Sequence, residues 1–219
     1  MSEAFHPFGY FSLSACLVIL AAVIVTAAVY RGREGERYSP LNHFISELGE
    51  TGVSRLAPVF NGALILGGML FVPFIVGLGT QLNSFWSMLA MLAGLGTCVA
   101  CVAVGFFPMN RLELHSKAAL AFFRLGLVMV TLFSIAVLAQ PPDRVVLPYG
   151  SVFFGALTAL AYAAFLFLHG RRAAETGPAQ AHSLDATPER PRIWLLPILE
   201  WAVLATTLFW FAGIAIIIS

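Results

Sequence analysis

Residues 11–30 read FSLSACLVILAAVIVTAAVY, and they decide the class of fold because they contain no charged side chain. An apolar helix of about 20 residues spans the hydrocarbon core of a bilayer, which is ~30 Å thick. The tail before it, residues 1–9, has no Lys or Arg and so lacks the basic segment of a secretory signal peptide. We therefore expect a retained first transmembrane helix.

The rest of the chain has the same apolar character. Of its 219 residues, 59% are hydrophobic and only 11% are charged, and the mean hydropathy is +0.88. Soluble domains carry about 25% charged residues, so this composition indicates a polytopic membrane protein. The net charge of +1 and the absence of a glycine-rich phosphate loop favour neither nucleic acid nor nucleotide as a partner.

Polar connections divide the chain into six apolar spans. We expect an all-α fold, a six-transmembrane-helix bundle that forms a single integral membrane domain over residues 1–219. A Pro-, Ala- and Thr-rich segment over residues 170–192 is typical of a flexible linker. The predicted spans are residues 11–30, 56–80, 85–107, 117–139, 146–169 and 193–218.

The distribution of basic residues predicts the orientation. An even number of spans puts both termini on one side, and Arg144 is the one basic residue in the connections on that side. The other basic residues outside the spans lie in the three connections of the opposite side: Arg31, Arg33, Arg37, Arg55, Arg111, Lys117, Arg171, Arg172, Arg190 and Arg192. The positive-inside rule places these connections in the cytoplasm and both termini outside.

The segment Tyr38–Gly52, YSPLNHFISELGETG, is the most polar patterned stretch, and we call it the island. Ser39 as N-cap, Pro40 at the first helical position and Gly49 at the end predict a short amphipathic helix between spans one and two. Its apolar face would carry Leu41, Phe44, Ile45 and Leu48, and its polar face Asn42, His43, Ser46 and Glu47. Two interpretations stay open, an interfacial helix that floats at the membrane surface and a lid over a site in the bundle.

Three polar residues fall inside the spans, where such residues are rare and often functional: Asn61, Arg124 and Glu200. Arg124 and Glu200 are predicted at similar depth, so an ion pair between them is expected. The pair would either fasten two helices or floor a cytoplasm-facing polar vestibule that binds a ligand. The rim of this vestibule would carry His43, Glu47, Asn110, Glu113 and His115.

The same rim residues are the candidates for chemistry. His43 and His115 could act as metal ligands or general bases, with Glu47 or Glu113 as acid–base partner, as in a zinc-dependent hydrolase. The sequence has no H-E-x-x-H motif, and solvated or hydrogen-bonded histidines are the simpler interpretation. The cysteines, Cys16, Cys98 and Cys101, lie within spans and are interpreted as packing residues. No cofactor is expected.

Several short motifs resemble one family in order and position. They are Ser46-Glu47-Leu48-Gly49, Phe60-Asn61-Gly62 with Gly67-Gly68, Gly105-Phe106-Phe107-Pro108 followed by His115 and Phe122-Phe123, and a glutamate early in the last span. In these motifs the chain resembles the bacterial and archaeal membrane proteins of domain-of-unknown-function family 998. The resemblance implies a bacterial or archaeal cytoplasmic membrane and no particular activity. Trp201 stands where a basic residue would be expected after the glutamate.

We therefore predict a protein that binds or positions a lipid-like amphiphile, or a partner membrane protein, through the polar vestibule. Asn61, Asn110, Arg124 and Glu200 would bind the ligand. The first alternative is a membrane-embedded lipid hydrolase. The second is an accessory subunit whose Phe-rich faces pack against a larger membrane complex.

Overall fold

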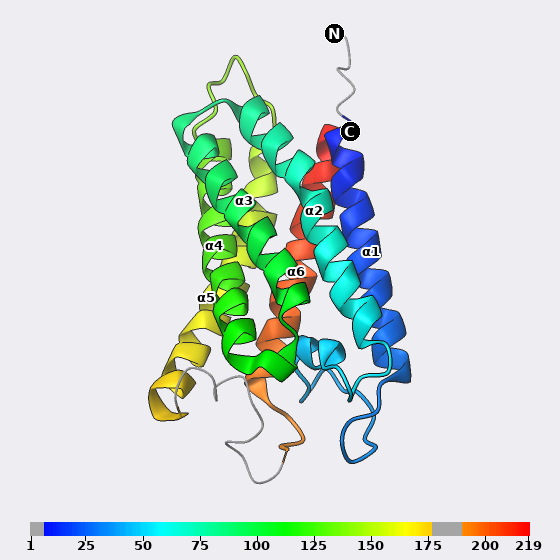
Figure 1. Ribbon diagram of the computed structural model, residues 1–219. Helices are drawn as coiled ribbons and strands as arrows, with labels where there is room; N and C mark the ends of the chain where they lie inside the picture. Colours follow the sequence, from blue (N-terminus) through cyan, green and yellow to red (C-terminus); the bar gives the residue numbers. More distant parts are fainter. Residues whose placement is uncertain (1–6, 177–189) are drawn as a thin grey trace.

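The computed structural model describes residues 7–176 and 190–219, and these residues form six long helices (Figure 1). All six are long and apolar enough to cross a membrane, as the sequence predicts. Three short 3-10 helices, η1 (Ile45–Gly49), η2 (Met109–Arg111) and η3 (Tyr149–Ser151), lie in the connections. The long helices are α1 (Phe8–Val29), α2 (Ala57–Leu82), α3 (Phe85–Phe106), α4 (Leu112–Leu138), α5 (Val152–Thr176) and α6 (Leu195–Ile218).

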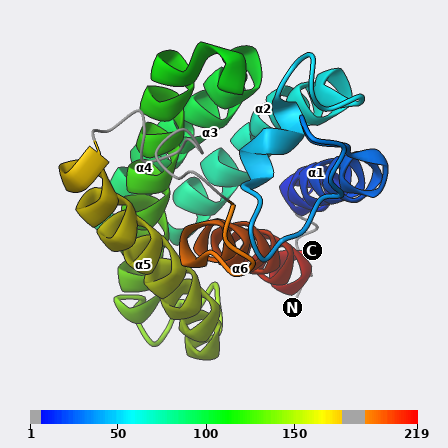
Figure 2. The same cartoon turned by 90° about the horizontal axis from the view of Figure 1, so that it is seen from below.

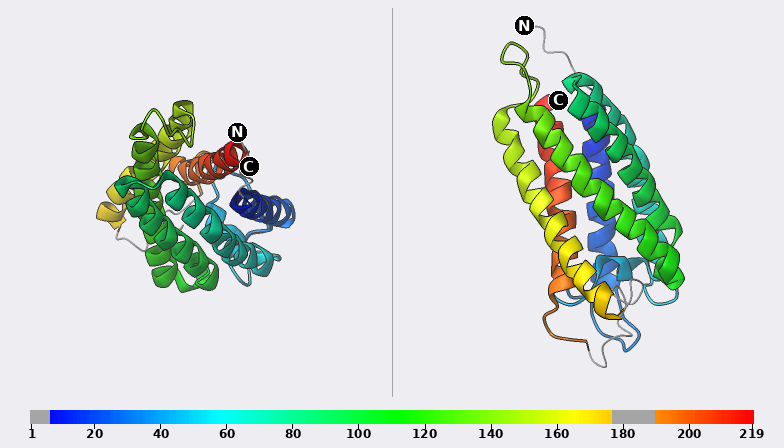
Figure 3. Two further views of the ribbon diagram at one scale, coloured as in Figure 1. Left: turned by 90° about the horizontal axis from the view of Figure 1, so that it is seen from above. Right: turned by 90° about the vertical axis from the view of Figure 1, so that its left-hand side faces the viewer.

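The helices form a closed ring in chain order (Figure 2). Each helix packs against the next one, and α6 completes the ring by packing against both α5 and α1. Figure 3 shows the same ring from above and from the side, with the helices running along one common axis. The connections between α2 and α3 and between α3 and α4 are short, which makes these sequential helices antiparallel neighbours.

Aromatic side chains fill one half of the ring. Phe71 of α2 stacks on Phe211 of α6 with ring centroids 4.0 Å apart, and Trp210 lies 5.9 Å from Phe133 of α4. The outer surface carries many exposed large apolar side chains, including Phe85, which is 70% exposed. Such a surface would promote aggregation in water but contacts acyl chains in a bilayer.

The two ends of the ring differ in charge. The start of α1 lies beside the end of α6, because Gly9 packs directly against Ser219, so these ends share one side of the bundle. The island and the connections that contain the clustered basic residues lie at the other side (Figure 1). We call this side the island end.

Two helices differ from the expected spans. α4 begins at Leu112, so the first turns of this helix include Glu113 and His115. α5 begins only at Val152, directly after η3, and it continues to Thr176. The predicted linker, residues 170–192, is therefore helical at its start, and residues 177–189 lie outside the described residues.

The amphipathic island helix is a wrong prediction. Only Ile45–Gly49 is helical, and it is a 3-10 helix preceded by an extended Phe44. Residues of both predicted faces are buried, since Leu48 is fully covered and Glu47 is 4% exposed, whereas Leu41 of the apolar face is 52% exposed. Two of the polar side chains that would face water in an interfacial helix instead have partners within the protein: Glu47 pairs with Arg190, and Asn42 donates to the carbonyl of Pro191. The segment therefore does not need one face in water and one in the membrane.

The close approach of α2 and α3 generates the first prediction. A Cβ atom on Gly105 would lie 2.6 Å from the backbone oxygen of Asn61, whereas one on Gly62 would meet nothing within 4 Å. Gly105→Ala should therefore force the two helices apart and reduce the free energy of unfolding by about 1–3 kcal/mol. Gly62→Ala, the matched control, should leave stability unchanged or slightly raised. Thermal unfolding in detergent measures both, and equal effects would contradict the packing of α3 on α2.

Candidate functional site

A cavity of about 110 Å³ lies inside the ring, on the island side of the Phe71–Phe211 stack. A single water needs only ~10–15 Å³, so this space is several times larger than a hydration site. Its walls come from α1, α2, α3, α4, α6 and η1, and they are mostly apolar. We call it the ring cavity. Its polar lining residues are Ser46, Thr97, His115, Glu200 and Thr207.

The η1 helix closes the ring cavity at the island end. Ile45 and Ser46 line the cavity, and the backbone N–H of Ile45 donates to Glu200 Oε2 at 2.7 Å. On the opposite edge, Asn61 Nδ2 of α2 donates to the carbonyl of Gly49 at 2.9 Å. Two of the predicted intramembrane polar residues therefore hold η1 in place, one from α6 and one from α2.

His115 lines the same end of the cavity from α4. Its Nδ1 lies 2.8 Å from the carbonyl oxygen of Phe107, which can only accept, so Nδ1 carries the hydrogen. In the neutral imidazole, Nε2 is then an acceptor, and no described residue gives it a hydrogen bond. The buried hydroxyl of Ser46 likewise has no partner among the described residues.

Glu47 lies on the other side of η1 and forms a buried ion pair. Its Oε1 accepts from the N–H of Phe44 at 2.8 Å, and its Oε2 accepts from Arg190 Nη2 at 2.9 Å. Arg190 Nη1 also donates to the carbonyl of Asn42 at 2.8 Å. Burial lowers the pKa of Arg190, but the hydrogen bonds and charge of Glu47 outweigh it, so the guanidinium pKa lies above its ordinary value.

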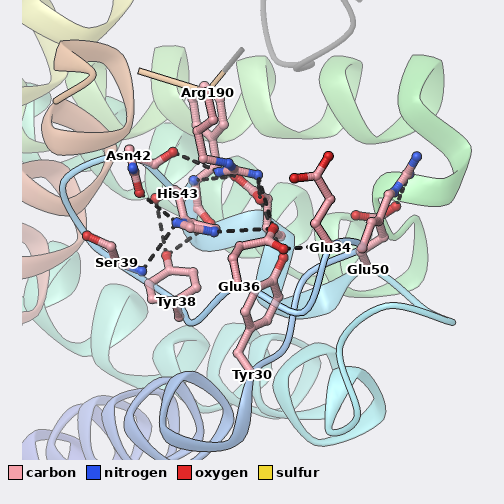
Figure 4. A network of polar contacts seen from close by, with 12 residues as sticks. Tyr30, Glu34, Glu36, Tyr38, Ser39, Asn42, His43, Glu50 and Arg190 are labelled. Carbon is pink, nitrogen blue, oxygen red and sulfur yellow. Dashed lines mark hydrogen bonds and ion pairs between the residues drawn. The ribbon is translucent and has the colours of Figure 1, made fainter. Parts of the chain in front are cut away.

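Residues 190–194 lie along the outer face of the island, and we call them the strap. Figure 4 shows Arg190 pointing toward Asn42, His43 and Glu36. Asn42 Nδ2 donates to the carbonyl of Pro191 at 3.0 Å, and the N–H of Trp194 donates to the carbonyl of Leu41 at 2.8 Å. The strap thus joins the start of α6 to the island. Sequence reasoning assigned Arg190 to a flexible linker and missed this role.

His43 is buried in the same network. It packs edge-on against Tyr30, and its Nδ1 lies 2.8 Å from Asn42 Oδ1 (Figure 4). Its Nε2 is 3.8 Å from Glu36 Oε1. Burial lowers the pKa of His43 below its ordinary 6.5, opposed by the charges of Glu47 and Glu36 and assisted by that of Arg190.

The structure separates the other predicted site residues. Asn110 is exposed and exchanges hydrogen bonds with Thr51 in the neighbouring connection. Glu113 is exposed and pairs with Lys117 one turn along α4. The expected Arg124–Glu200 ion pair is wrong: Glu200 binds the backbone of η1, and Arg124 is exposed on α4. α4 and α6 are not neighbours in the ring because α5 lies between them.

The residues proposed for a metal site do not come together. Within residues 7–176 and 190–219, no group of three His, Cys, Asp or Glu residues is placed to hold a metal ion. His115 faces the ring cavity, whereas His43 lies in the strap network and Glu113 faces outward. Cys16 and Cys101 donate to backbone carbonyls of neighbouring helices, as packing residues do.

Six apolar helices in a closed ring define a multi-pass membrane protein. Its sequence matches the model of the family described as "Protein of unknown function (DUF998)" over residues 14–216, nearly the whole chain, and the protein belongs to that family. No curated protein and no solved structure matches the chain.

The Glu47–Arg190 pair generates the second prediction. Glu47→Ala leaves Arg190 without its carboxylate and the N–H of Phe44 without an acceptor, so it should reduce the free energy of unfolding by about 3–5 kcal/mol. Thermal unfolding in detergent measures the loss. Glu113→Ala, which removes the carboxylate of the exposed pair with Lys117, is the control and should leave the unfolding midpoint unchanged. Similar midpoints for both variants would contradict a structural role for the buried pair.

The burial of His43 generates a third prediction. Because its pKa is lower in the folded protein, the unfolded chain takes up the proton first as the pH falls below 6.5. The stability due to neutral His43 is therefore present above this pH and is lost below it. The unfolding midpoint of the wild type should fall more between about pH 7.5 and 5.5 than that of His43→Gln. His115 and His169 are present in both proteins, so parallel pH profiles would show that His43 does not contribute.

Proposed function

We propose that the protein binds a lipid-like amphiphile in the ring cavity, with the apolar part of the ligand between the helices and its polar part at the island end. One observation supports this proposal above all: the walls of the cavity are mostly apolar, with Thr97 and Thr207 as their polar side chains, and its ionisable residues, His115 and Glu200, both lie at the island end together with Ser46. Amphiphiles have this same division. Small-molecule sites generally combine an apolar lining with a few polar groups that fix orientation.

The location of the cavity also fits a ligand taken from the membrane. Its walls belong to helices that are long and apolar enough to cross a bilayer, so membrane lipids are the nearest source of a ligand. At the end opposite η1 the cavity is bounded by Phe71 and Phe211, whose stacked rings would limit the length of the ligand's apolar part. Binding a partner membrane protein remains a hypothesis that none of these contacts specifically favours.

Binding is better supported than hydrolysis. His43 and Glu47 are occupied in the strap network, and Glu113 pairs with Lys117 at the surface. Of the four candidates for catalysis, only His115 lines the cavity. The carboxyl group that also lines this end, Glu200, accepts from the N–H of Ile45 and makes no hydrogen bond to His115. The described residues therefore hold no hydrogen-bonded histidine–carboxylate pair that would activate water.

We infer an orientation with the island end in the cytoplasm and both termini outside, in a bacterial or archaeal cytoplasmic membrane. The charge distribution supports it: the basic connections gather at the island end, and Arg144 lies in a connection at the other end. In this orientation η1 and the strap separate the cavity from the cytoplasm. The polar end of a bound amphiphile would lie just beneath them.

Filling the cavity tests the proposed function. Ala119 of α4 lines the cavity, and Ala119→Phe should occupy the ligand's space. Native mass spectrometry of the protein in mild detergent should show one retained amphiphile on the wild type and loss of that species in Ala119→Phe.

Val128 of the same helix is 46% exposed, so Val128→Phe adds a ring on the outer surface and serves as the control. This variant should retain the amphiphile. Equal retention by both variants would show that the bound lipid lies on the outside of the ring and would refute the proposal. Circular dichroism of each variant checks that the helices are intact.

A further inference from the structure

The polar end of the ring cavity is specific enough to indicate which head group it accepts. It brings together Glu200 of α6, His115 of α4 and Ser46 of η1, all less than 10% exposed. Each side chain comes from a different element, so the three are positioned by the tertiary fold and not by one helix. This inference rests on the proposed function and concerns the chemistry of its ligand.

The polar groups left at this end include both acceptors and donors of hydrogen bonds. Glu200 Oε2 accepts from Ile45, and the described residues give its other oxygen no hydrogen bond. His115 Nε2 is an acceptor in the neutral ring because Nδ1 donates to Phe107. Ser46 Oγ can both donate and accept, and it also lacks a described partner.

Charge further limits the head group. None of the residues that line the cavity is Lys or Arg, within the part of the chain that the structure describes. A phosphate, sulfate or carboxylate would therefore be buried without a cation to balance it, which is strongly unfavourable in an apolar surrounding. For the same reason the buried Glu200 carboxyl group, which has no cation in the lining, is favoured in its neutral form and offers an ammonium head group no charge to pair with. Arg124 and Arg190 do not line the cavity, so neither provides that cation.

We infer that the ring cavity accepts an amphiphile with an uncharged hydroxyl head group, held by Glu200, His115 and Ser46. A hydroxyl donates one hydrogen bond, which His115 Nε2 can accept. It also accepts one, which the O–H of Ser46 or of the Glu200 carboxyl group can donate. A carbonyl or an ether has no hydrogen to give to His115 Nε2, and an alkane could use none of the three.

A series of probes that differ only in the head group tests this inference: 1-octanol, octanoic acid, octylamine and n-octane. Isothermal calorimetry with the wild-type protein in detergent measures the affinity, and Ala119→Phe reports partition into micelles. After the micelle signal of Ala119→Phe is subtracted, 1-octanol should bind roughly tenfold more tightly than n-octane, because its head group forms one or two additional hydrogen bonds. Octanoic acid at neutral pH should bind no better than n-octane.

Two matched serines refine the test. Ser46→Ala should weaken 1-octanol roughly three- to tenfold and leave n-octane unchanged, because it removes one hydrogen bond and keeps the apolar walls. Ser54 is also buried with an unpartnered hydroxyl, but it does not line the cavity. Ser54→Ala should therefore leave both affinities unchanged.

The outcomes separate this inference from the proposed function. If no probe binds the wild type above the Ala119→Phe background, the cavity is not an amphiphile site, and both the proposed function and the hydroxyl inference are refuted. If 1-octanol and n-octane bind equally, the proposed function stands and the hydroxyl inference is refuted, since water alone would then occupy the polar end. Tighter binding of octanoic acid or octylamine would likewise overturn the uncharged head group.

Discussion

The backbone of η1 must satisfy its hydrogen-bonding groups within the protein, and the architecture of the island end depends on this constraint. Irregular backbone at membrane depth is tolerated only where it is buried in protein or lines a cavity. Two successive N–H groups donate to glutamate side chains from different elements. The N–H of Phe44 donates to Glu47, and the N–H of Ile45 donates to Glu200. At the other end of η1 the carbonyl of Gly49 accepts from Asn61. An element of five residues is thereby anchored to both α2 and α6.

These anchors divide the polar residues of the island end into two sets, which differ in how many hydrogen bonds they can still make to a ligand. Glu47 uses both of its oxygens on Phe44 and Arg190, so it has little capacity left for a ligand. Glu200 uses one oxygen on Ile45 and lies against the ring cavity. On the strap side, His43 Nε2 also lacks a hydrogen bond from the described residues, but it lies 3.8 Å from Glu36 Oε1 and does not line the ring cavity. On the cavity side, Ser46 and His115 Nε2 lack described partners and face the space that a ligand would occupy. This difference is why we place ligand binding beneath η1 and not at the surface of the island.

The spans could be predicted from sequence because each carries its own signal, an uninterrupted apolar run of about 20 residues. The conformation of the island could not be predicted in this way. A helical period assigns residues to faces by their angle around the helix, and it contains no information about hydrogen-bond partners from distant segments. Glu47 and Arg190 are 143 positions apart, and Ile45 and Glu200 are 155 apart. The Arg124–Glu200 pair failed for a related reason. Equal depth in a bilayer does not fix which way two helices face: Arg124 is exposed on α4, whereas Glu200 is buried and lines the ring cavity.

The residue types around the ring cavity support its being more than a packing defect. Its walls include the small side chains of Gly94, Thr97, Cys98, Cys101 and Ala119 on α3 and α4. Larger apolar residues at such positions would fill the space, and cavity filling is a common route to greater stability. The other half of the ring is filled by Phe71, Phe211 and Trp210. The same chain thus packs one half of its interior tightly and leaves the half next to Glu200 and His115 hollow, an arrangement that a bound ligand would complete.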